Sequence, residues 1–368
     1  MKLTTQVKLL PSAAQRAALL ATMGRVNAAC GDISAQAWVA QSFRKFDLQR
    51  LLYRDIRKQF GLSAQMAVRA IAKVADAYRL DHATQRDFRP LGGICYDARV
   101  LSWREDSVSI WTLAGRERIP FVCGDRQRAQ LLGKKGETDL VFRDGEFYLL
   151  PTIEVGEAPP LEVVEVLGVD LGIVNIACDS DGETHSGEHL SSLRRRQRRL
   201  RRKLQKKGTK SAKRLLKKQR RRESRFSRDV NHQISKRMVA KAERTKRAIA
   251  LEQLAGILLR VRARRPQRAT LHSWAFHDLG AKIQYKAKLA GVPVIFVDPR
   301  NTSRTCPQCG AIDKANRPTR DTFCCVTCGH AGPADTIAAI NIGRRAAVNR
   351  PYAGEICSAH HSPASLAL

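Results

Sequence analysis

The run Val166-Leu-Gly-Val-Asp-Leu-Gly-Ile-Val-Asn-Ile-Ala-Cys178 is apolar, contains two glycines and carries a single carboxylate, Asp170. Its aliphatic and β-branched residues predict one buried strand. An ionised aspartate inside a buried strand is unfavourable unless another group compensates its charge. The rest of the fold must therefore bring such a group to Asp170.

Two further carboxylates occupy similar positions far downstream. Glu252 ends the strand-like run that begins at Arg247, and Asp335 opens an amphipathic helix. Each acid alone is more commonly a turn or cap residue, so the prediction rests on all three together. Carboxylate oxygens are the ligands that Mg²⁺ prefers. Two such ions stabilise both the attacking and the leaving oxygen in phosphodiester cleavage, so the three acids predict a magnesium-dependent nuclease site.

The composition indicates a polyanionic partner. The chain has 368 residues, enough for two or three domains, and 66 Lys and Arg against 34 Asp and Glu give a net charge of +32. Such an excess favours nucleic acid, bound through phosphates. A membrane surface is the alternative, but the sequence lacks an apolar run of about twenty residues and a signal-peptide core. We therefore expect a soluble intracellular protein with no membrane partner.

The N-terminal part predicts helices inserted into a β domain. Residues 2–10 predict one strand, and Ser12 is a plausible N-cap for the helix that follows. Two more helices are expected at 47–60 and 63–80. Between residues 89 and 157, short alternating runs separated by turn signals predict a small antiparallel barrel or sandwich, which the first strand could join.

The most biased segment lies between Ser191 and Arg228, with 20 Lys and Arg and one acid, Glu223. Leucines at helical spacing, interrupted by the break 208–211, predict an antiparallel helical hairpin. Like charges four residues apart destabilise a free helix, and a nucleic-acid backbone would relieve that repulsion. The residues expected to bind nucleic acid are Arg194, Arg195, Arg198, Arg202, Lys206, Lys213, Lys217, Arg221 and Arg225.

Five of the ten cysteines crowd between residues 306 and 328. Two C-x₂-C-Gly knuckles, fifteen residues apart, predict a zinc ribbon with one structural Zn²⁺ held by Cys306, Cys309, Cys325 and Cys328. Cys324 is an alternative third ligand and His330 an alternative fourth. A redox dithiol is the other interpretation, but two knuckles at this spacing disfavour it. The loop between the knuckles carries basic residues that could touch nucleic acid: Lys314, Arg317 and Arg320.

Several motifs follow one another between residues 160 and 345: Gly168-Val-Asp-Leu-Gly172, Arg228-Asp-Val-Asn-His232, Leu251-Glu-Gln-Leu254, Trp274-Ala-Phe276, Tyr285-Lys-Ala287, Val297-Asp-Pro299, the two cysteine knuckles and Ala338-Ala-Ile-Asn-Ile342. In this order they resemble the TnpB family, the OrfB-type insertion-sequence proteins with a zinc ribbon that are related to type V CRISPR effectors. The N-terminal part fits more loosely.

The resemblance implies a multidomain α/β fold around an RNase H-like, RuvC-type nuclease core with a basic helical hairpin. The expected divisions are a wedge-like β-barrel at 1–10 and 88–160, a helical recognition domain at 11–87, the nuclease domain at 161–300 and 329–348, a target nucleic-acid-binding zinc ribbon at 301–328, and a flexible tail at 349–368. The oligomeric state is left open.

The resemblance also implies an RNA-guided DNA endonuclease of a transposable element, cytoplasmic and nucleoid-associated in a bacterium or archaeon. Asp170, Glu252 and Asp335 match the family's catalytic acids, which hold two Mg²⁺ ions. A guide RNA from the transposon end would direct cleavage of double-stranded DNA next to a short flanking motif. Three departures from the family pattern remove no metal ligand: Gln253, Pro333-Ala334 and Ile337. The alternatives are a nuclease-inactive RNA-guided regulator, expected to lack an acid, and an RNA-independent DNA transposase.

Overall fold

The computed structural model describes residues 1–133, 135–254 and 276–348. Two compact units, Met1–Gly156 and Glu157–Leu368, divide the chain, and each is described by itself. Three sequence-based expectations fall wholly or partly outside the described residues: the tail at 349–368, a basic loop at 260–268 and the start of a helix predicted at 271–290.

Three helices of the first unit lie between its second and third strands. They are α1 (Ala13–Val39), α2 (Lys45–Phe60) and α3 (Ala64–Leu80). The Ser12 side chain accepts from the Gln15 backbone while the Gln15 side chain accepts from the Ser12 backbone, a reciprocal cap that fixes the start of α1. Gly61 ends α2 in a left-handed conformation, at φ +59°. The predicted N-cap of α1 is therefore confirmed.

A nearly closed antiparallel sheet forms the rest of the first unit. Its strands are β1 (Lys2–Thr4), β2 (Val7–Leu9), β3 (Ile94–Tyr96), β4 (Leu101–Trp103), β5 (Ser107–Thr112), β6 (Gly115–Val122), β7 (Lys135–Arg143) and β8 (Glu146–Glu154). The order is β3-β7-β8-β2-β6-β5-β4, with β1 on β8. The N-terminal segment thus joins this sheet, as expected, and its core is continuous with that of the helices.

Two details of the first unit differ from the prediction. Residues 2–10 form two strands rather than one, because β1 pairs only with β8, whereas β2 pairs with both β8 and β6. The break in the strand at residues 5 and 6, between β1 and β2, lets β2 pair with both β8 and β6. The sequence also does not predict the short helix α4 (Asp125–Leu131), whose seven residues are too few to show a periodic pattern.

The second unit is built on a five-stranded sheet in the order β11-β10-β9-β12-β13. Its strands are β9 (Glu165–Asp170), β10 (Asn175–Asp179), β11 (Thr184–Ser186), β12 (Arg247–Glu252) and β13 (Val294–Val297). Strands β9, β12 and β13 are parallel, whereas β10 runs antiparallel to both its neighbours. The single strand predicted over 166–178 is therefore wrong. The chain reverses after Asp170, and a Cβ on Gly172 would lie only 2.5 Å from the Asn175 carbonyl oxygen.

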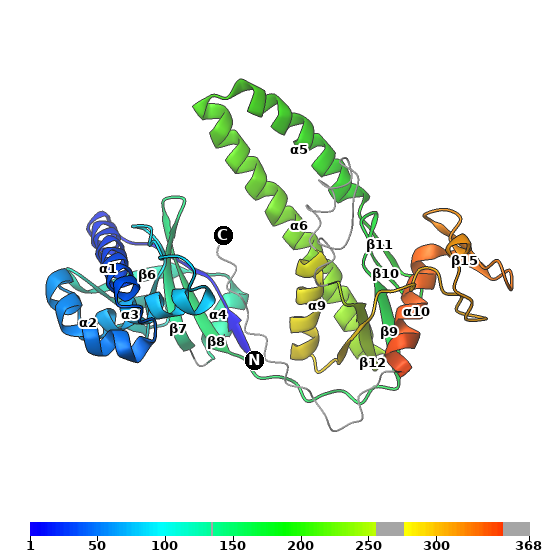
Figure 1. Ribbon diagram of the computed structural model, residues 1–368, viewed down its shortest axis with the longest axis horizontal. Helices are drawn as coiled ribbons and strands as arrows, with labels where there is room; N and C mark the ends of the chain where they lie inside the picture. Colours follow the sequence, from blue (N-terminus) through cyan, green and yellow to red (C-terminus); the bar gives the residue numbers. More distant parts are fainter. Residues whose placement is uncertain (134, 255–275, 349–368) are drawn as a thin grey trace. The chain divides into compact units, whose positions relative to one another are not determined.

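The helices of this unit are α5 (Glu188–Lys207), α6 (Lys210–Arg244), α9 (Phe276–Leu289) and α10 (Ala334–Val348). Helices α6 and α9 lie on one face of the sheet and α10 on the other, whereas α5 extends away from the sheet beside α6 (Figure 1). Side chains of α6 and α9 share one apolar cluster with Leu167, Val169 and Leu251, and α10 packs against Ala250 and Val297 on the opposite face. Helices α5 and α6 form the predicted antiparallel hairpin, with Gly208 ending α5 and Thr209 capping α6.

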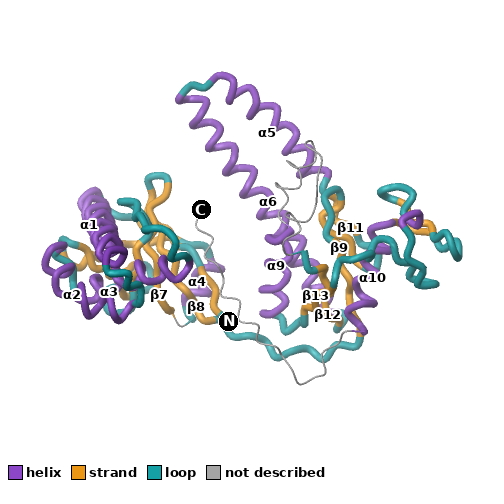
Figure 2. Tube along the Cα trace, viewed as in Figure 1, coloured by secondary structure: helices purple, strands orange, loops and turns teal. Residues whose placement is uncertain are grey.

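The segment between β13 and α10 forms a small cysteine-containing module (Figure 2). It contains the 3₁₀ turn η1 (Lys314–Asn316) and the two-stranded sheet of β14 (Thr322–Cys324) and β15 (Ala331–Pro333). No helix in the described part of the chain is long and apolar enough to cross a membrane.

Candidate active site and metal centre

The alternation of side chains along two parallel strands places two of the predicted acids together. Asp170 is the last residue of β9 and Glu252 the last of β12, and the register pairs Val169 with Leu251. Both acids therefore lie at the carboxyl edge of neighbouring strands, where open α/β sheets bind ligands. Both also share the face that α10 covers, and Asp335 lies in the first turn of that helix.

A contact between small residues brings α10 close to β9. A Cβ added to Gly168 would lie 1.9 Å from the Ala339 carbonyl oxygen and 2.5 Å from the Gly343 nitrogen. Only glycine fits at this position without moving the helix. The glycine two residues before Asp170 thus sets how near Asp335 comes to the sheet.

The three acids bring negative charges close to one another. Each is partly buried. Burial, together with the neighbouring charges of Glu252 and Asp335, raises the pKa of Asp170 to about 7. Burial also raises the pKa of Glu252. A divalent cation would remove the repulsion that contributes to the shift of Asp170, and three carboxylates are a donor set that suits Mg²⁺.

Two cationic or polar groups hold Asp335. Asn175 Nδ2, at the start of β10, donates to Asp335 Oδ2 at 2.8 Å. Arg317 Nη2 donates to Asp335 Oδ1 at 3.2 Å. The sequence suggested Arg317 as a nucleic-acid contact, whereas the structure places its guanidinium on a candidate catalytic acid. No sequence signal marks Asn175 beyond its being a polar residue in an apolar run.

Glu252 is held from a different segment. The hydroxyl of Thr302, in the stretch that leads from β13 to the first cysteine, donates to Glu252 Oε1 at 2.6 Å. Fifty residues separate the two in sequence, and Thr302 belongs to no regular element, so periodicity alone does not reveal the contact. The cysteine module therefore touches the acid site at two points, Thr302 and Arg317.

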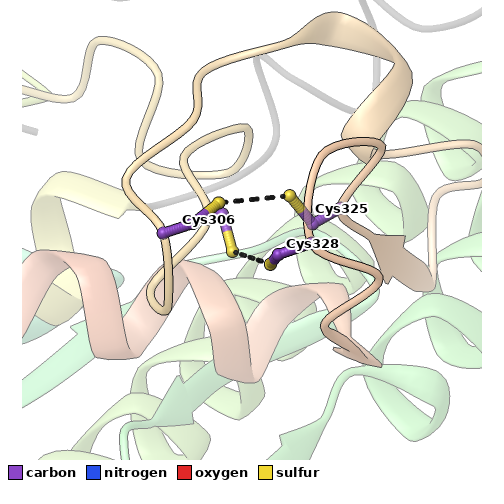
Figure 3. A group of neighbouring side chains, drawn as sticks. Cys306, Cys325 and Cys328 are labelled. Carbon is purple, nitrogen blue, oxygen red and sulfur yellow. Dashed lines mark hydrogen bonds between the residues drawn. The ribbon is translucent and has the colours of Figure 1, made fainter.

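The four knuckle cysteines converge in a separate site. Their Sγ atoms all lie within 4.8 Å of one another, and theirs is the only such cluster of three or more potential ligands in the described ranges. The Cys306–Cys328 and Cys309–Cys325 sulfur pairs are 3.6 Å apart, and the sulfurs point toward one another (Figure 3). A tetrahedral zinc with 2.3 Å bonds requires sulfurs about 3.8 Å apart, so these residues fit Zn²⁺.

The backbone explains why the cysteines converge. Gly310 and Gly329, each directly after a knuckle, have φ values of +76° and +74°. Backbone N–H groups of the second knuckle, first that of Cys328, and the neighbouring thiols lower the pKa of Cys325 to about 6, whereas the neighbouring thiols help to raise the pKa of Cys309 and Cys328. Cys325 is therefore the thiol of these three that most readily becomes the thiolate that binds metal. The alternative ligands Cys324 and His330 do not belong to the cluster.

The predicted nucleic-acid contacts divide into two groups. Seven of the nine side chains are exposed on the α5–α6 hairpin: Arg195, Arg198, Arg202, Lys206, Lys213, Lys217 and Arg225. Arg221 is half-buried, as is Arg194. The guanidinium of Arg194 faces Glu223 at 3.7 Å between the two helices, and Arg201 pairs with the same carboxylate at 3.0 Å. Arg194 therefore contributes to the packing of the hairpin rather than to its outer surface.

Comparisons with known proteins match two segments of the chain. A family model described as a probable transposase, OrfB_IS605, matches residues 151–254, and a Cas12f1-like TNB domain model matches residues 276–342. A TnpB-like protein of Methanocaldococcus jannaschii is 32% identical over 134 residues, which cover 36% of this chain and 48% of the relative. The predicted resemblance to the TnpB family is confirmed.

The similarity extends from TnpB-like proteins to CRISPR effectors. A CRISPR-associated endodeoxyribonuclease Cas12f1 of Sulfoacidibacillus thermotolerans is 47% identical over 72 residues, which cover 20% of this chain and 17% of the relative. The chain thus aligns with less than half the length of each of these two relatives.

Solved structures share the fold. A Cas12f1–sgRNA–target DNA complex superposes with a TM-score of 0.56 at 12% identity, covering 88% of this chain and 82% of the other. The mini-RNA-guided endonuclease Cas-phi3 gives 0.52 at 11% identity, covering 96% and 94%. The mixed α/β fold is therefore that of Cas12f and Cas-phi effectors.

Proposed function

We propose that this chain is an RNA-guided DNA endonuclease that hydrolyses phosphodiester bonds with Mg²⁺. The observation that carries the proposal is the convergence of Asp170, Glu252 and Asp335 at one edge of the sheet, where burial and the charges of the other two acids raise the pKa of Asp170. The parallel strands β9, β12 and β13 beside an antiparallel hairpin are compatible with an RNase H-like core. The TnpB-like and Cas12f1 relatives support the same reaction class.

Each residue has a distinct role in this proposal. The three carboxylates supply the oxygens that hold the ions. Bound there, two Mg²⁺ ions would activate the attacking water and stabilise the leaving 3′ oxygen. The guanidinium of Arg317, held beside Asp335, keeps one positive charge at the rim of the acid cluster and attracts the scissile phosphate. Asn175 fixes the rotamer of Asp335 without adding charge.

The exposed cations of the α5–α6 hairpin bind nucleic-acid backbone. Backbone phosphates neutralise a surface on which like charges otherwise repel one another, and the interaction carries no sequence information. Sequence choice then comes from base pairing between a guide RNA and its target. We infer that the guide derives from the end of the transposon that encodes the chain.

The first experiment is to express the chain with its flanking genomic DNA and to sequence the RNA that purifies with it. A discrete RNA that reads into the element end, together with Mg²⁺-dependent cleavage of a matched duplex that Asp170→Asn abolishes, would support the proposal. A discrete RNA without cleavage by the wild-type protein would instead indicate an RNA-guided regulator. Strand transfer without RNA would indicate a transposase.

A further inference from the structure

A buried threonine links the zinc module to one of the candidate catalytic acids. Thr302 is only 3% exposed. Its hydroxyl lies 2.6 Å from Glu252 Oε1 and 3.1 Å from the Pro299 carbonyl oxygen. Because a hydroxyl has one proton and the bond to a carboxylate is shorter and stronger, the proton goes to Glu252.

Thr302 supplies the only hydrogen bond to the Glu252 carboxylate among residues 1–133, 135–254 and 276–348. A glutamate side chain has three rotatable bonds, and fixing them costs conformational entropy. The bond to Oε1 reduces that freedom before any ligand arrives. It also leaves Oε2 without a hydrogen bond from the same described residues, so that this oxygen remains available to a cation.

A buried asparagine in turn holds Thr302. Asn341 is 4% exposed and lies on α10, the helix that carries Asp335. Its Nδ2 donates to the carbonyl oxygens of Thr302, at 2.8 Å, and Thr305, at 2.7 Å. Both amide hydrogens are therefore used, and both go to the segment that immediately precedes the zinc ligand Cys306. This segment cannot shift relative to α10 without breaking them.

These contacts form one chain of hydrogen bonds from α10 to β12. We propose that Thr302 and Asn341 are positioning residues that fix Glu252 relative to Asp335 for divalent-cation binding, a role that rests on the proposed function of the acids. Groups that hydrogen-bond to metal ligands commonly change metal affinity or activity by about 10–100-fold when they are removed. A role confined to anchoring the zinc module would instead change the zinc content or the stability of the fold.

The test compares Thr302→Val, which keeps the shape and loses the hydroxyl, with Thr302→Ser, which keeps the hydroxyl. Mn²⁺ binding to the full RNA-loaded chain is measured by electron paramagnetic resonance of the free ion. The Asp170→Asn variant is purified with its RNA in the same way, and the Mn²⁺ that it binds is subtracted as the contribution of the RNA. Zinc content and unfolding temperature are measured for every variant, and Thr302→Ala tests the same loss if the valine variant does not fold.

We expect Thr302→Val to weaken Mn²⁺ binding about 10–100-fold at unchanged zinc content and unfolding temperature, and Thr302→Ser to restore it. Mn²⁺ binding that is lost in Asp170→Asn but unchanged in Thr302→Val would overturn the positioning role alone. A weakened affinity that serine does not restore, accompanied by zinc loss, would overturn it as well. Equal Mn²⁺ binding by the wild type and Asp170→Asn would overturn the proposed metal site itself and the positioning role with it.

Discussion

Replacing Gly168 with alanine should separate the two halves of the candidate active site. The added Cβ would lie 1.9 Å from the Ala339 carbonyl oxygen, whereas ordinary contacts begin at 3.4 Å. Helix α10 would therefore have to move away by about 1.5 Å, carrying Asp335 with it. A 1 Å misplacement of catalytic groups can cost about 100-fold in rate, so we expect at least that loss of cleavage.

The same substitution should lower stability. Overpacking a dense core costs about 1–3 kcal/mol, equivalent to a fall of roughly 2–12 °C in unfolding temperature for a unit of this size. The matched control is Gly280→Ala in α9, where a Cβ meets nothing within 4 Å. This control should cleave normally and unfold at the same or a slightly higher temperature. Wild-type cleavage and an unchanged unfolding temperature in Gly168→Ala would refute the close-packing argument.

Three further predictions concern the acids, the zinc site and the hairpin. The pKa of Asp170 is raised to about 7, so below pH 7 a proton on this carboxylate competes with the cation. The Mg²⁺ concentration needed for half-maximal cleavage should therefore rise as the pH falls below 7. A Mg²⁺ requirement that stays constant from pH 8 to pH 6 would contradict this prediction. Cys309→Ser should lose zinc and unfold at a lower temperature, whereas Cys324→Ser should keep one zinc per chain by atomic emission, since its sulfur is outside the cluster. Arg198→Ala should reduce the slope of log affinity for RNA against log salt by about 0.7–0.9 at unchanged stability. Arg194→Ala should mainly destabilise the hairpin because it removes one partner of Glu223, and equal effects of the two variants on the salt slope would show this division to be wrong.

The zinc site and the end of one acid-bearing strand are predictable from local sequence. Spacing alone identifies the two cysteine knuckles, and the apolar run that ends at Glu252 identifies the end of a strand. The apolar run around Asp170 continues past this acid, so its sequence does not show that a strand ends there. What brings these residues together is the register of parallel strands, which no local pattern encodes. The signal for the third acid is weaker, because Asp335 is marked only by its place at the start of an amphipathic helix, and many acids occupy such a place.

Local sequence patterns do not reveal the hydrogen bonds that hold the acids, and the reason is physical. The side chains of Asn175, Thr302 and Arg317 each make one hydrogen bond to an acid far away in sequence. A polar residue in a loop or at the start of a strand has the same sequence signature whether or not it has such a partner. The single strand expected over 166–178 failed for a related reason. Its turn is itself apolar, with Leu171, Ile173 and Val174, so composition does not mark the reversal.

The closed end of the α5–α6 hairpin has a practical consequence for engineering. Gly208 turns the chain at φ +64°, and a Cβ there would meet nothing within 4 Å. The residues around it, 205–211, are all exposed. Surface turns of this kind tolerate inserted domains because few contacts depend on them. A fluorescent protein spliced after Gly208 would therefore track the hairpin while the acid-bearing strands and the cysteine module keep their native connections.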